Sequence, residues 1–164
     1  MTTKSEHGAD ELTKVILIAM QAVLKPIGFT KKGATFRRET EEATQIVSLQ
    51  RSSSSTKDVP VVTVNLGTTL HATRRYLKAT RPVTSVGDCD WQQRIGAYTE
   101  NRDDKWWTVG NHSEASSAGE EVAALLRSSA LPELDRMSTE SAGQDMPLTM
   151  ACTLAPLAGA CASI

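Results

Sequence analysis

The stretch that decides the fold is Thr44-Gln-Ile-Val-Ser-Leu-Gln-Arg51, followed after a serine-rich interval by Val59-Pro-Val-Val-Thr-Val-Asn-Leu66. In both segments β-branched and other apolar residues alternate with polar ones, which is the period of a strand that buries one face. The segment before them, Ala34-Thr-Phe-Arg-Arg-Glu-Thr40, continues the pattern and is separated from the next by Glu41-Glu42. Three such segments joined by polar connections predict an antiparallel meander.

Further strands and a helix are predicted on either side of the meander. Residues 91–97 and 105–109 are rich in strand-forming side chains and flank a polar turn, which brings the predicted sheet to about five strands. Towards the N-terminus, apolar residues recur at helical spacing over residues 10–25, and Pro26 and Gly28 end the pattern. The period therefore changes from helical to extended near Phe29.

A second helix is predicted over about residues 114–127, where Ser117 and Glu120 have capping-box spacing. Helices before and after an antiparallel sheet predict an α+β fold in which both helices cover one face of the sheet. Pro132 at a first helical position predicts a short further turn. The predicted core consists of Leu12, Ile16, Ala19, Val23, Phe29, Phe36, Val47, Leu49, Val62, Val64, Ile95, Val122 and Leu125.

The length of 164 residues suits one domain with extensions rather than two domains. We expect residues 1–9 to be a flexible N-terminus, residues 10–137 to form the α+β domain, and residues 138–164 to be a disordered tail. The tail prediction rests on composition, because residues 146–164 carry no charge and contain two prolines.

The charge of the chain is balanced overall but uneven along its length. The formal net charge is -1, yet residues 1–82 hold thirteen Lys and Arg against seven Asp and Glu, and the second half is acidic. The balance gives no reason to expect a nucleic-acid or membrane partner. Three cysteines outside any metal-binding spacing, and no secretory leader pattern, predict a cytoplasmic protein.

A series of local strings resembles one known family. These strings are Leu24-Lys-Pro-Ile-Gly-Phe-Thr-Lys-Lys-Gly-Ala-Thr-Phe-Arg-Arg38, Val47-Ser-Leu-Gln-Arg-Ser52 and Val64-Asn-Leu-Gly67, then Trp91, Arg94, Ile95, Trp106 and Trp107. In this order they look like the bacterial family catalogued as domain of unknown function 4304, over about residues 10–137. The resemblance implies a compact, intracellular α+β domain. It brings no established activity, cofactor or catalytic residue.

No motif for catalysis, a metal or a cofactor is recognisable, so we assign no catalytic residue, no metal site and no cofactor. The histidines His7, His71 and His112 are scattered along polar segments. Cys89 lies between Asp88 and Asp90, whose charges disfavour a thiolate.

Five residues are candidate ligand contacts. Gln50, Asn65 and Arg94 are polar groups that we expect near the ends of otherwise apolar strands, where they could bind each other or a ligand. Arg37 and Trp106 would add a cation and a stacking surface on an open sheet face. Because neighbouring strand residues point to opposite faces, only one of Trp106 and Trp107 can face such a groove.

Three functions are compatible with these residues. The leading hypothesis is a non-enzymatic binding or interaction domain that uses the open sheet face, with a protein or a small anionic ligand as partner. An alternative is a small hydrolase or transferase for an anionic substrate, with Arg37 or Arg94 as anion clamp and His71 as general base. A further alternative is an immunity or antitoxin-like protein that blocks another protein.

Overall fold

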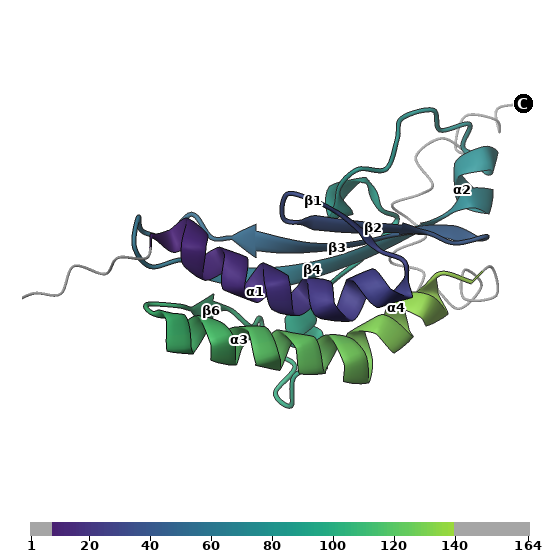
Figure 1. Cartoon of the computed structure of the whole chain (residues 1–164). Coiled ribbons are helices and arrows are strands. Elements are labelled where there is room, and N and C mark those ends of the chain that lie inside the picture. The colour runs from purple at the N-terminus through teal and green to yellow at the C-terminus, as the bar shows by residue number, and fades with distance from the viewer. Residues whose placement is uncertain (1–7, 140–164) are drawn as a thin grey trace, which may run out of the picture.

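A computed structural model describes residues 8–139 of the chain, and Figure 1 shows their arrangement. The α-helices are α1 (Ala9–Leu24), α2 (His71–Tyr76), α3 (His112–Leu125) and α4 (Leu131–Met137). The strands are β1 (Thr30–Lys32), β2 (Thr35–Glu39), β3 (Ala43–Arg51), β4 (Val61–Leu70), β5 (Trp91–Arg94) and β6 (Trp107–Thr108). A π-helical segment, Leu126–Ala130, joins α3 to α4.

The sheet is antiparallel and its strands follow the order β1-β2-β3-β4-β5, with β6 also paired to β4. The register places Asn65 of β4 between Ser48 of β3 and Arg94 of β5. The meander predicted from the alternating segments is therefore present, with β1 added at one edge. β6 meets β4 at Val61 and Val62, beyond the region that pairs with β5.

Helices α1, α3 and α4 lie on one face of the sheet, as Figure 1 shows. The side chains of Phe36, Val47, Val64 and Leu66 point into this layer and are fully buried. α1 and α3 pack closely because residue 119 is glycine: a Cβ there would lie 2.9 Å from the Cβ of Ala19. The predicted α+β architecture is confirmed, and all predicted core residues are buried except Ala19 and Leu125, which are partly exposed.

Several predicted element bounds require correction. α3 begins at His112, about two residues before the predicted start near residue 114, because Asn111 caps it by accepting a hydrogen bond from the Glu114 amide at 2.9 Å. The strand predicted over residues 91–97 ends at Arg94 and continues as a 3-10 helix. β4 runs on to Leu70, so Asn65 lies in the middle of a strand and not near its end.

The second face of the sheet is partly covered by the segment of residues 77–90, the crossing segment. Val83 and Cys89 of this segment are buried against Ile46 of β3. Arg37 Nε donates a hydrogen bond to the Val83 carbonyl at 3.1 Å, which ties the segment to β2. The part of this face beyond the crossing segment, towards β5, is left open and holds the pocket described below.

The buried part of the domain extends one residue beyond the predicted bounds at each end. Ala9 and Ser138 lie just outside the predicted bounds of 10–137, but both are buried in the structure. Residues 1–7 of the predicted flexible N-terminus and residues 140–164 of the predicted tail lie outside the described residues. In residues 8–139, no helix is both long enough and apolar enough to cross a membrane.

Candidate functional site

A pocket of about 300 Å³ lies on the open part of the sheet, and three of the five predicted site residues line it. They come from three neighbouring strands: Gln50 from β3, Asn65 from β4 and Arg94 from β5. Alternation places all three on the face away from the helices. The full lining, which we name the amide pocket, is Gln50, Asn65, Val86, Gly87, Gln92, Gln93 and Arg94.

The amides of this pocket satisfy part of their hydrogen-bonding capacity. Asn65 Nδ2 donates to Gln50 Oε1 at 2.6 Å, and Gln92 Nε2 donates to the Cys89 carbonyl at 3.0 Å. Within residues 8–139, Gln50 Nε2 and Asn65 Oδ1 have no hydrogen-bond partner. A carboxamide can donate twice and accept twice, so the pair offers both a donor and an acceptor to a ligand.

Arg94 is the charged member of the amide pocket, and its charge is neutralised. Arg94 Nη1 donates to Asp104 Oδ2, and its guanidinium lies 5.3 Å from the ring centre of Trp106. Trp106 Nε1 donates to the same Asp104 oxygen at 3.0 Å. The hydrogen bond from Arg94, and then that from Trp106, lowers the pKa of Asp104. Trp106 thus positions Arg94 from beside the pocket, of which it is not a lining residue.

The two tryptophans point to opposite faces, as predicted. Trp107 is buried in the helix layer, where its Nε1 donates to Glu121 Oε2 at 2.8 Å. Trp106 is only partly buried and lies beside Arg94. Trp107 begins β6, whereas Trp106 lies just before the strand and is held beside Arg94 by its hydrogen bond to Asp104.

Arg37 does not line the amide pocket. Its guanidinium pairs with Glu39 and donates to the Val83 carbonyl, so it holds the crossing segment in place. Arg37 was predicted to be a ligand contact because it lies on the same face of the sheet as Gln50, Asn65 and Arg94. The crossing segment that separates them could not be recognised from strand periodicity.

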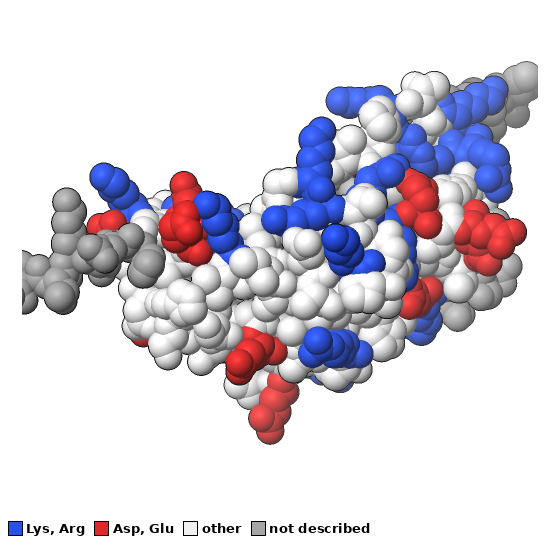
Figure 2. Space-filling model, viewed as in Figure 1, with Lys and Arg blue, Asp and Glu red and all other residues white. Residues whose placement is uncertain are grey.

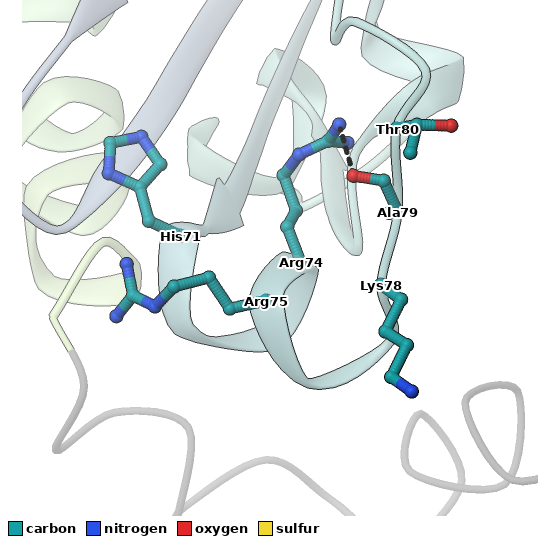
Figure 3. A pocket seen from close by; sticks show the side chains of 6 residues that line it. All are labelled: His71, Arg74, Arg75, Lys78, Ala79 and Thr80. Carbon is teal, nitrogen blue, oxygen red and sulfur yellow. Dashed lines mark hydrogen bonds between the residues drawn. The ribbon is translucent and has the colours of Figure 1, made fainter.

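A second hollow of about 480 Å³ lies beside α2, and sequence reasoning did not assign it as a site. Its lining residues are His71, Arg74, Arg75, Lys78, Ala79 and Thr80, shown in Figure 3. We name it the basic hollow. In Figure 2 the Lys and Arg side chains gather over the part of the molecule where Figure 1 places α2 and the β1–β2 hairpin. The run of cations between residues 74 and 81 was the available signal.

His71 is poorly arranged to act as a general base. Its Nε2 lies 3.0 Å from Glu39 Oε2, and its Nδ1 lies 3.1 Å from the Glu41 carbonyl oxygen. Both ring nitrogens therefore face acceptors within the fold, and a general base needs one ring nitrogen free to accept a proton. Arg37 and Arg94, the two residues proposed to bind an anionic substrate, are not among the residues that line the basic hollow.

Cys89 is equally unsuited to nucleophilic chemistry. Burial, followed by the charges of Asp90 and Asp88, raises the pKa of its thiol to about 12. The direction agrees with the expectation from its acidic neighbours, although burial is the larger cause. In residues 8–139 no three His, Cys, Asp or Glu side chains are grouped so that they could hold a metal ion.

The fold and the site define a small α+β domain whose antiparallel sheet carries helices on one face and a polar pocket on the other. The chain belongs to the family described as Domain of unknown function (DUF4304), whose pattern matches residues 20–136. This agrees with the resemblance seen in the sequence. No curated protein and no solved structure matches the chain.

Proposed function

We propose that this protein is a non-enzymatic binding domain whose recognition surface is the open part of the sheet. The observation that carries the proposal is the convergence of Gln50, Asn65 and Arg94 on one pocket of about 300 Å³. This volume is at the lower end of the range found for small-ligand sites, roughly 300 to 1,000 Å³. Amides with unused donors and acceptors supply binding groups but no nucleophile or base.

The chemistry of the pocket favours an uncharged polar group as its ligand. Asp104 compensates the charge of Arg94, so the remaining binding groups are the side-chain amides of Gln50, Asn65 and Gln92. A primary amide or a polyhydroxyl group can satisfy such donors and acceptors in pairs. An Asn or Gln side chain of a protein partner has this chemistry, and an immunity-like interaction would be one form of it.

Protein-observed NMR with the full-length chain tests this proposal. Small primary amides, polyols and carboxylates serve as three probe sets. We expect the amides or polyols to shift the resonances of Gln50, Asn65 and Gln92 in a saturable manner, and Asn65→Leu to abolish the shifts. Thr35→Val is the matched control, because Thr35 lies on the same face without lining the pocket. Preferential binding of carboxylates, or no saturable shift, would contradict the proposal.

The enzymatic alternative would depend on His71, which lies beside the basic hollow and is paired with Glu39, although both of its ring nitrogens face acceptors within the fold. A hydrolase or transferase for an anionic substrate would turn over members of phosphatase, nuclease and esterase panels. The non-enzymatic proposal would be wrong if the protein turned over a substrate and if His71→Ala or Arg94→Ala abolished that turnover without changing the circular dichroism spectrum. Panels without turnover above the buffer control are the expected result.

A further inference from the structure

The basic hollow has a concentration of positive charge that the fold does not neutralise. Three full cations, Arg74, Arg75 and Lys78, line it together with His71, and no acidic residue is among its lining. Several other arginines pair with carboxylates, as Arg38 does with Asp135 and Arg94 with Asp104. Within residues 8–139, no carboxylate lies within ion-pairing distance of the three cations of the hollow.

The wall of the hollow is built by a hydrogen-bonded turn after α2. Arg74 Nη2 donates to the carbonyls of Ala79 and Arg81, while the Ala79 amide donates back to the Arg74 carbonyl at 2.9 Å. Lys78 adopts the left-handed conformation with φ 52°, which reverses the chain. Figure 3 shows the Arg74 side chain extending from α2 towards the Ala79 carbonyl oxygen on the opposite segment.

Of the three cations that line the basic hollow, one has a fixed side-chain position and two have side chains that can change rotamer. Arg74 is held by neutral carbonyls, so its position is set while its charge remains uncompensated. Arg75 and Lys78 are exposed and extend to either side of the hollow in Figure 3. Long exposed side chains can close on a ligand at the cost of rotamer entropy.

We propose that the basic hollow is a second binding site, specific for a small molecule that carries a diphosphate group. Planar guanidinium groups match phosphoryl oxygens in a two-pronged geometry, and a lysine adds a mobile point charge. Two arginines and one lysine suit the charge of about three on a diphosphate. The volume of about 480 Å³ leaves room for more than a single inorganic ion. This site is separate from the amide pocket and does not depend on the ligand proposed there.

Isothermal titration of the full chain with pyrophosphate tests this site directly. The double variant Arg75→Ala/Lys78→Gly removes two cations, and glycine at 78 retains the left-handed turn. The matched control, Lys31→Ala/Lys32→Ala, removes the same charge from the exposed strand β1. We expect saturable binding that the first variant weakens about tenfold and the control changes by less than about twofold. Arg75→Gln provides a second test if the double variant does not fold.

Competition separates diphosphate recognition from general attraction to anions. Citrate, a carboxylate of similar charge, and a short single-stranded oligonucleotide are titrated under the same salt conditions. Weaker binding of both than of pyrophosphate supports the proposal. The proposal would be overturned if citrate bound as tightly as pyrophosphate or if the oligonucleotide bound more tightly. It would also be overturned if the two double variants weakened binding equally, or if millimolar pyrophosphate showed no saturable binding.

Discussion

Gly67 of β4 lies directly beneath Cys89 of the crossing segment, at a separation that leaves no room for a side chain. A Cβ on residue 67 would lie 2.8 Å from Cys89 Sγ and 2.9 Å from Cys89 Cβ. The crossing segment can therefore lie flat on the sheet only because residue 67 is glycine. This contact also defines one edge of the amide pocket, since Val86 and Gly87 of the same segment line it.

We expect Gly67→Ala to destabilise the protein by about 1–3 kcal/mol, because overpacking forces the crossing segment away from the sheet. The free energy of unfolding from urea titration measures the effect. Gly87→Ala is the matched control, because a Cβ there meets only Ser85 Oγ at 3.6 Å. Equal stability of the two variants would show that the segment is not held against Gly67.

Gln45 is a fully buried polar side chain on the helix-facing side of β3. Its Oε1 accepts from Arg38 Nε at 2.7 Å, and its Nε2 donates to Ser138 Oγ at 2.7 Å and to Asp135 Oδ1 at 2.9 Å. Gln45 therefore joins the sheet to the end of α4.

Replacing Gln45 by alanine leaves a buried space and removes the acceptor of Arg38 Nε, while Ser138 Oγ keeps its bonds to Leu134 and Thr68, so we expect Gln45→Ala to cost about 2–3 kcal/mol of stability. Gln50→Ala, an exposed position on the same strand, should cost less than about 0.5 kcal/mol. Thermal and urea unfolding of both variants measure the difference. A loss at Gln50 as large as that at Gln45 would contradict the assignment of the buried network.

The carboxylate of Asp88 caps the turn at residues 84–88 in the crossing segment. It accepts hydrogen bonds from the Thr84 and Ser85 amides at 3.0 and 2.9 Å. These bonds, the one from Thr84 first, lower the pKa of Asp88 to about 2 from its usual 3.8. The folded state thus favours the ionised form, and the resulting stability is present above the usual pKa and lost as the pH falls towards 2.

We expect Asp88→Asn to remove about 1 kcal/mol of stability at neutral pH, a value reduced for the exposure of this carboxylate to solvent. The difference between wild type and variant should shrink between pH 4 and pH 2. Urea unfolding across that range measures it. Asp58→Asn, at an exposed aspartate on another connection, is the control. A difference that does not change with pH would refute the role of the Asp88 charge.

The Cys89 thiol should resist alkylation in the folded protein. With its pKa raised to about 12, about one thiol in ten thousand is ionised at pH 8, and burial restricts access further. Iodoacetamide labelling followed by peptide mass spectrometry measures residue 89 separately from the other cysteines. We expect labelling at this residue only after denaturation. Rapid labelling under native conditions would show that the crossing segment opens readily.

Much of the fold could be predicted from local patterns. Successive side chains of a strand point to opposite faces, so a half-buried strand shows alternating apolar and polar residues. This alternation in residues 44–51 and 59–66 predicted β3 and β4, with the buried positions Val47, Leu49, Val62 and Val64. The start of α3 was predicted only to within about two residues, near residue 114 instead of His112, because several residues from Asn111 to Ser117 are good capping residues. The hydrogen bond from the Glu114 amide to Asn111, which is seen only in the structure, sets the first residue of the helix.

The candidate site was only partly predictable. Gln50, Asn65 and Arg94 were selected as polar residues on apolar strands, and the sheet register brings them together. Arg37 was selected as a cation on the open sheet face, but the crossing segment separates it from the pocket. The basic hollow was missed because the turn after α2, and not a periodic pattern, shapes it.

The amino-acid sequence alone determined the α+β class, the faces of the strands and the burial of one tryptophan of the Trp106–Trp107 pair, because these follow from the spacing of neighbouring residues along the chain. Only the tertiary structure decided which polar groups share a pocket and which arginines are neutralised. Strand register, and the path of residues 77–90 across the sheet, join positions that are distant in the sequence, and no local pattern encodes such contacts.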